Sequence, residues 1–115
     1  MIAFITMGLA PSPTAPPTPV TITLVGGLFN ASGGIETEGT YNMSPVEVKG
    51  STFHCTNNFV ASDGSGTFTA LSVYQAGTLR GTWHIVDATG SFANLRGNGS
   101  LVMYAGGETW EGKIF

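Results

Sequence analysis

Apolar and polar side chains alternate with a period of two along most of the chain after residue 20. In residues 51–60, for example, Phe53, Cys55 and Phe59 fall on one face, and His54 and Thr56 fall on the other. This alternation is typical of β-strands, in which successive side chains point to opposite faces. The predicted strands cover residues 20–29, 35–43, 46–50, 51–60, 67–74, 78–86, 101–104 and 108–114, and residues 46–60 form either one long strand or two strands broken at Gly50. No segment shows a convincing helical period.

Glycine-rich segments separate these strands and predict the turns between them. Asp63-Gly64-Ser65-Gly66 is the strongest turn signal, and Ala105-Gly106-Gly107 predicts a final hairpin. Gly26-Gly27, inside the first predicted strand, indicates a bulge or a strong bend. Short strands with regular turn signals are typical of a sandwich or a closed barrel. Because closure removes exposed strand edges, we predict an all-β fold, a small antiparallel β-barrel of about seven to eight strands. An eighth strand would come from the N-terminal segment or from a neighbouring subunit.

The first 19 residues differ from the rest and predict an extended arm ahead of a barrel domain at residues 20–115. Residues 1–10 are apolar and uncharged but too short to span a bilayer. Residues 11–19 hold five of the six prolines, which favours a semi-rigid polyproline II spacer. The arm is either a signal or anchor remnant or an assembly device that reaches another subunit. In the second case the contacts would come from Ile2, Phe4, Ile5, Met7, Leu9, Pro16 and Pro17.

The composition excludes some functions and favours an extracellular or cell-surface location. Only 10% of the residues are charged and the formal net charge is −3, so the chain lacks the basic patch that a nucleic-acid binder needs. Cys55 is the single cysteine, which excludes a disulfide within the chain and favours a buried thiol. Asn30, Asn42 and Asn98 each begin a pattern that fits N-glycosylation.

Candidate catalytic groups are few, and we predict neither a metal site nor a cofactor. Glu36 and Glu38 share a strand face about 6.6 Å apart by backbone rise, which suits a solvated face better than an acid–base pair. His54 and His84 each lie in a predicted strand without the spacing of a metal site. The many aromatic residues would either fill a small barrel or line its lumen. The predicted lumen residues, should a ligand bind there, are Glu36, His54, Trp83 and Tyr104.

Three motifs resemble those of a known superfamily. They are Gly64-Ser65-Gly66-Thr67-Phe68, Gly81-Thr82-Trp83 and the segment from Gly90 to Gly99, in which Phe92 and Leu95 would plug one end of a barrel. Together they resemble the allene oxide cyclase-like barrels, which include plant dirigent proteins, and small secreted bacterial members in particular. The resemblance implies an eight-stranded antiparallel barrel that forms oligomers. The catalytic positions of the plant cyclases find no match here, so no catalytic role follows from it.

Two functions from different classes fit these observations. The first is a non-catalytic extracellular barrel that acts through self-assembly, as an oligomer or filament subunit, or through surface binding. Its partners would be copies of itself, with no nucleic acid and no transmembrane span. The second is a cyclase-like or dirigent-like protein that binds or cyclises an apolar small molecule in the barrel lumen. A lumen filled by side chains would weigh against the second function.

Overall fold

The computed structural model describes residues 17–44 and 47–115. Within these ranges the chain is β-structure, with the 3-10 turn η1 (Gly90–Phe92) as its only helical segment. No helix there has the length and apolar character needed to cross a membrane. The strands are β2 (Thr18–Val25), β3 (Leu28–Gly33), β4 (Thr37–Met43), β5 (Glu47–Lys49), β6 (Thr52–Ala61), β7 (Thr67–Gln75), β8 (Arg80–Ala88), β9 (Gly97–Tyr104) and β10 (Gly107–Ile114).

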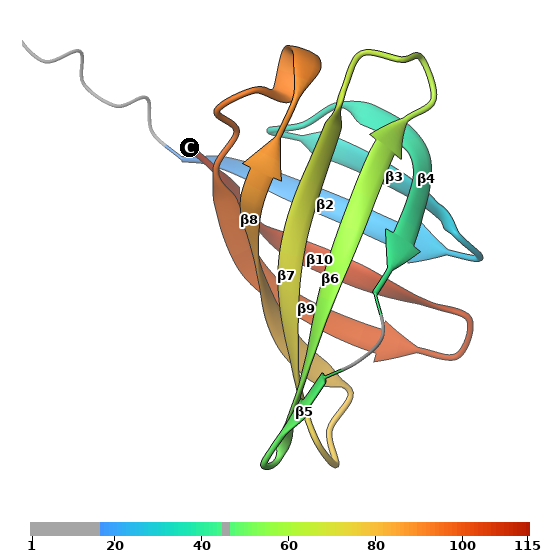
Figure 1. Cartoon of the computed structure of the whole chain (residues 1–115), viewed down its shortest axis with the longest axis vertical. Helices are drawn as coiled ribbons and strands as arrows, with labels where there is room; N and C mark the ends of the chain where they lie inside the picture. The colour runs from blue at the N-terminus through green and yellow to red at the C-terminus, as the bar shows by residue number, and fades with distance from the viewer. Residues whose placement is uncertain (1–16, 45–46) are drawn as a thin grey trace, which may run out of the picture.

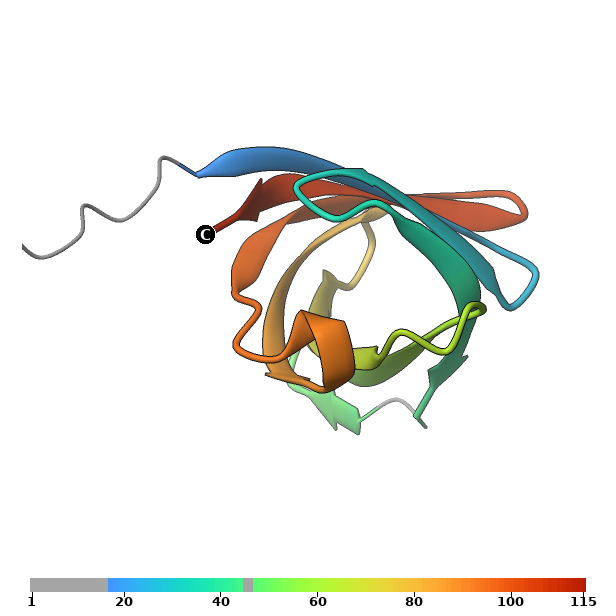
Figure 2. The same ribbon diagram turned by 90° about the horizontal axis from the view of Figure 1, so that it is seen from above.

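The strands form a closed antiparallel barrel. Their order in the sheet is β4-β3-β2-β10-β9-β8-β7-β6-β5, and β4 also pairs with β6. This last pairing closes eight strands into a ring and leaves β5 as an additional strand on the edge of β6. Figure 1 shows the barrel from the side, and Figure 2 shows the ring from above. The predicted β-barrel is therefore confirmed.

The eighth strand of the ring comes from a hairpin between β2 and β3, where we predicted one bent strand. Gly26 and Gly27 both have positive φ angles, 60° and 83°, and Val25 pairs with Leu28 across them. A two-residue turn with two positive φ angles matches the twist of its flanking strands, and glycine adopts it without strain. The prediction of a bulge or bend at Gly26-Gly27 was wrong, and the barrel closes without a strand from the arm or a neighbour.

The arm predicted at residues 1–19 lies mostly outside the described residues. This applies to Ile2, Phe4, Ile5, Met7, Leu9 and Pro16 among its predicted contacts, whereas Pro17 is described and is exposed. Strand β2 already begins at Thr18, which pairs with Ile114 at the end of β10. The barrel therefore starts slightly before the predicted boundary at residue 20.

Residues 47–61 form two strands, which is one of the two arrangements that the sequence left open. The chain turns at Gly50, which has a φ angle of 62°. Strand β6 then pairs with β5 along its first residues and with β4 along its last residues. At the second contact the two backbones lie so close that a Cβ atom on Gly39 would collide with the carbonyl oxygen of Val60. Gly39 thus permits the contact that closes the ring.

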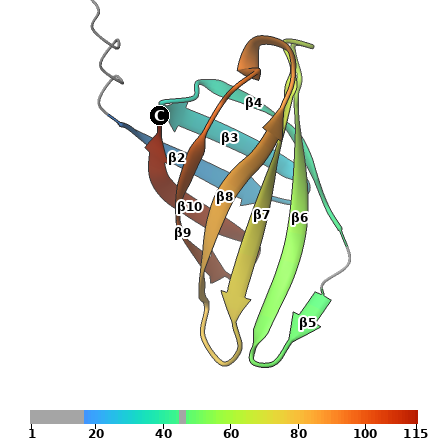
Figure 3. The ribbon, with the colours of Figure 1, turned by 60° about the vertical axis from the view of Figure 1, so that its left-hand side comes forward.

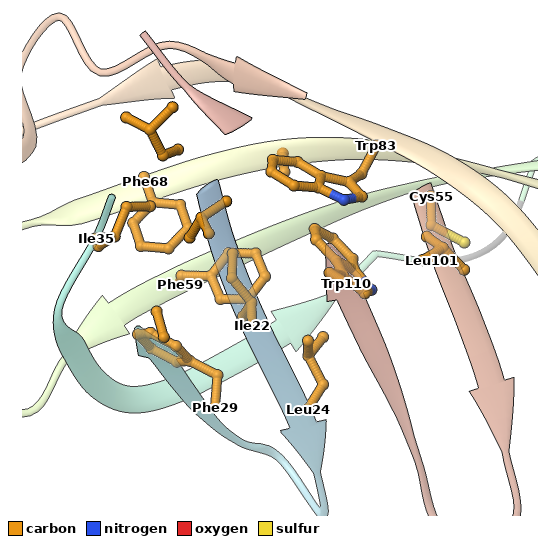
Figure 4. Packing of buried hydrophobic residues seen from close by; sticks show 14 of the residues in the cluster. Ile22, Leu24, Phe29, Ile35, Cys55, Phe59, Phe68, Trp83, Leu101 and Trp110 are labelled. Atoms are coloured by element: carbon orange, nitrogen blue, oxygen red, sulfur yellow. The ribbon is translucent and has the colours of Figure 1, made fainter. Parts of the chain in front are cut away.

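Aromatic side chains fill the interior of the barrel (Figure 4). Trp83 and Trp110 stack with ring centroids 5.4 Å apart, and Phe59 stacks on Phe68 with centroids 4.6 Å apart. Gly99 lies directly opposite Trp83 on the neighbouring strand. Because glycine has no side chain, it leaves room for the large indole ring. Pairing small with large residues in this way fills a core without voids. These large rings are almost completely removed from solvent, so the interior is a packed core.

The glycine-rich segment after β8 covers one end of the barrel (Figures 2 and 3). Gly90 begins η1 with a φ angle of 63°. Phe92 then meets Phe68 edge to face, with centroids 5.6 Å apart. Leu95 is partly buried against the same core. Both residues therefore pack where the sequence motif predicted a plug.

Candidate functional site

Inside the barrel, two aromatic side chains hold a buried carboxylate in place. Glu108 lies two residues before Trp110 on β10, so strand alternation points both side chains inward. Only 8% of Glu108 is exposed. Its Oε1 atom accepts one hydrogen bond from the Tyr74 hydroxyl at 2.9 Å and another from Trp110 Nε1 at 2.8 Å. A buried charge is tolerated where such donors replace water.

A second buried pair extends this polar cluster to strand β6. The Asn57 side-chain amide donates a hydrogen bond to Ser72 Oγ at 2.9 Å, and both residues are fully buried. The other polar atom of that amide, Asn57 Oδ1, has no hydrogen-bond partner among the described residues. An unpaired buried acceptor costs about 1–3 kcal/mol. We call Cys55, Asn57, Ser72, Tyr74 and Glu108 the interior polar cluster.

The Cys55 thiol and the Tyr74 hydroxyl of this cluster hold their protons more tightly than they would in water. Burial raises the pKa of the Cys55 thiol, and the nearby charge of Glu108 raises it further. Burial is also the largest cause of the raised pKa of Tyr74, with the charge of Glu108 acting in the same direction. The thiolate is the nucleophilic form of cysteine. A thiol with a raised pKa is therefore poorly suited to covalent catalysis.

The four predicted lumen residues are not brought together. Trp83 lies in the interior, where its Nε1 atom donates a hydrogen bond to the backbone oxygen of Ser100 at 3.0 Å. Glu36 is exposed directly before β4, and its Oε2 atom accepts a hydrogen bond from the Gly33 backbone nitrogen.

His54 and Tyr104 lie on the outer face of the barrel. The His54 ring is within hydrogen-bond distance of Thr52 Oγ1, at 3.0 Å, and Tyr104 is 44% exposed. Both side chains point outward because their strand neighbours point inward, namely Cys55 on β6 and Met103 on β9. Trp83 alone among the four predicted residues faces the interior.

Sequence reasoning missed Glu108 as an interior residue. The sequence feature that could have identified it is its position, because Glu108 shares a strand face with Trp110 in a predicted strand. By the period of two, Asn57 shares a face with Cys55 and Phe59, and Tyr74 shares a face with Phe68, and both faces are interior. Nothing in the sequence, however, paired Tyr74 with Glu108. Their strands lie far apart along the chain, and only the ring closure brings their side chains together.

The outer face of the barrel carries a band of exposed apolar residues. Leu28 pairs with Val25, Val25 pairs with Gly107, and Gly107 pairs with Tyr104, which makes one row across four strands. Leu28 is 60% exposed and Val25 is 49% exposed. Val102 is on the same face, two residues before Tyr104, and is also exposed. We call Val25, Leu28, Val102 and Tyr104 the outer apolar band.

A shallow groove continues the outer apolar band across β3 and β4. Its volume is about 490 Å³, and its lining is mainly apolar. Val25 and Leu28 belong to both the band and the groove, and Phe29 and Gly39 also line the groove. Among the described residues that line it, Glu38 is the only charged one. The groove therefore suits an apolar, uncharged segment rather than a highly charged partner.

A second hollow lies on the outer face over β5 to β8 and has a volume of about 580 Å³. His54, His84 and Glu47 line it. Among the residues that the structure describes, however, no three His, Cys, Asp or Glu side chains come together as metal ligands would. The two histidines therefore supply no metal-ligand cluster in the described part of the chain.

We compared the chain with known protein families, curated proteins and solved structures. No known protein family, curated protein or solved structure matches the chain. The arguments about function below therefore rest on its own residues.

Proposed function

We propose that the protein is a non-catalytic β-barrel that acts through self-assembly, with its N-terminal arm docking on a neighbouring copy. The observation that carries this proposal is the contrast between a filled interior and an outer face with an apolar band. Exposed apolar side chains that adjoin one another are typical of interaction sites. The interior, in contrast, is packed around Trp83, Trp110, Phe59 and Phe68.

The arm supplies a natural occupant for an apolar surface. Residues 1–10 contain no charged side chain, and six of them are Ile, Phe, Met or Leu. A head-to-tail contact between an arm and the next barrel gives a ring if it closes and a filament if it does not. We also propose an extracellular or cell-surface location, which the low charge and the exposed positions of Asn30, Asn42 and Asn98 support.

Light scattering on matched samples of the full chain and of residues 17–115 tests this proposal. The shorter chain keeps every strand of the barrel. We expect the full chain to form a species of several copies and the shorter chain to be a single barrel. Equal masses for the two chains would contradict self-assembly through the arm.

A second candidate function is the binding of an apolar small molecule inside a barrel like those of the allene oxide cyclase-like superfamily. The observation that favours it is the interior polar cluster, in which Asn57 Oδ1 lacks a partner that a ligand hydroxyl would supply. The filled core weighs against it, because a ligand would have to displace packed side chains.

A titration with 1-anilinonaphthalene-8-sulfonate tests this second candidate. Saturable quenching of tryptophan emission at one probe per chain, lost in Asn57→Leu, would support binding in the lumen. The absence of saturable binding would remove this candidate.

A further inference from the structure

The groove over β2, β3 and β4 has an opening that an extended chain segment can occupy. Its volume of about 490 Å³ is in the range of sites that hold small ligands or a few side chains. Val25 and Leu28 are exposed on one side of it, while Thr23, Asn30 and Thr40 contribute short polar side chains. A segment with two or three apolar side chains would cover the exposed surfaces of Val25 and Leu28.

From this geometry we propose that the groove receives residues 2–9 of a second copy of the chain. This inference rests on the proposed function and identifies the surface that the arm contacts. The segment contains Ile2, Phe4, Ile5, Met7 and Leu9 and has no charged side chain. Its composition therefore matches a lining that is mainly apolar and in which Glu38 is the single carboxylate among the described residues.

The direction in which the chain enters the barrel favours a second copy over the same copy. The described chain enters the barrel at Thr18, whereas Val25 lies at the opposite end of β2, about 23 Å away by strand rise. The prolines that precede Thr18 favour an extended spacer of about 3.1 Å per residue. To reach its own groove, the arm would have to reverse direction within this spacer. An arm that continues outward meets another barrel instead.

Substitutions in the full chain test this assignment. Leu28→Gln and Val25→Thr remove apolar surface from the groove, and both residues are exposed, so the barrel should fold as before. We expect each change to weaken assembly by at least about tenfold. Val86→Thr is the matched control, because Val86 is 48% exposed on β8, away from the groove, and Val25 is 49% exposed. The control should assemble as the original chain does.

A mixing experiment makes the test specific to a head-to-tail contact. One variant carries Leu28→Gln with Val25→Thr, and the other carries Phe4→Ser with Ile5→Ser. Each should be a single barrel alone, and their mixture should form a two-copy complex that grows no further, because one arm and one groove remain intact.

Light scattering, with tryptophan emission as the check of folding, distinguishes the outcomes. Assembly of the groove variant at the level of the original chain, with loss of assembly in the arm variant, would overturn the groove assignment and leave the proposed function intact. If the original full chain were already a single barrel, both the inference and the proposed function would fail.

Discussion

The inner and outer faces of the same strands carry apolar residues for different reasons. On β2 and β3, Leu24 and Phe29 point inward and are almost completely buried, while their neighbours Val25 and Leu28 point outward and are about half exposed or more. The inner residues hold the barrel together by burial. The outer residues add little to folding, and the proposed docking of the arm would give their apolar character a role.

The largest effect should come from the packed core. Trp110→Ala removes an indole that contacts Trp83 and Phe59 and leaves a cavity. We expect a loss of about 3–5 kcal/mol in the free energy of unfolding, measured by urea titration. Tyr104→Ala removes an aromatic side chain from the outer apolar band, and we expect it to change that free energy by less than about 0.5 kcal/mol. Similar losses of unfolding free energy in the two variants would show that the inner and outer faces contribute equally to stability, which contradicts this account.

The buried carboxylate should give the next largest effect. Glu108→Ala leaves the Tyr74 hydroxyl and Trp110 Nε1 without their acceptor, and we expect a loss of about 2–4 kcal/mol. Glu108→Gln keeps an acceptor oxygen and should lose less. Glu111→Ala is the control, because Glu111 is exposed on the same strand. A neutral result for Glu108→Ala in a urea titration would show that the cluster does not stabilise the barrel.

Asn57 and Ser72 should behave as a coupled pair with a smaller effect. Ser72→Ala alone removes the acceptor of the Asn57 amide and should cost about 1–3 kcal/mol. The double variant Asn57→Leu with Ser72→Ala removes both polar groups and should recover most of that loss, because no buried donor is left unpaired. A double-mutant cycle by chemical denaturation measures the coupling. Additive losses in the free energy of unfolding would show that Asn57 and Ser72 are not coupled.

The smallest effect concerns pH. The pKa of Tyr74 is raised above its ordinary value of 10.0 in the folded barrel, mainly by burial. The unfolded chain therefore releases this proton first as pH rises, so the stabilisation is complete below pH 10 and declines above it. We expect the free energy of unfolding to fall above pH 10 in the original chain and to fall less steeply in Tyr74→Phe. Identical slopes would exclude a contribution from Tyr74.

Much of the fold was predictable because strand alternation depends only on neighbouring residues. The inward faces of β6 and β7 follow directly from the period of two, and Phe92 and Leu95 plug the end where their motif placed them. The β2–β3 hairpin was missed because apolar residues continue on both sides of Gly26-Gly27. The positive φ angles of both glycines and the pairing of Val25 with Leu28 identify a tight turn rather than a bulge.

The candidate sites were harder to predict because they depend on closure. Glu36 and His54 were predicted as polar strand residues, but Glu36 is exposed just before β4 and His54 lies on the outer face of β6. Glu108 meets Tyr74 only because β10 and β7 become walls of the same ring. The row that forms the outer apolar band likewise depends on the register between β2, β3, β9 and β10. No local pattern contains that register.

The central claim is that the outer apolar band is a contact surface, and side-chain footprinting with hydroxyl radicals tests it most directly. Leu28 and Leu79 are matched probes, because they are 60% and 62% exposed in the barrel. The account predicts that Leu28 is oxidised less in the full chain than in residues 17–115, while Leu79 reacts equally in both. Equal oxidation of Leu28 in the two chains would show that the band stays uncovered and would contradict the account.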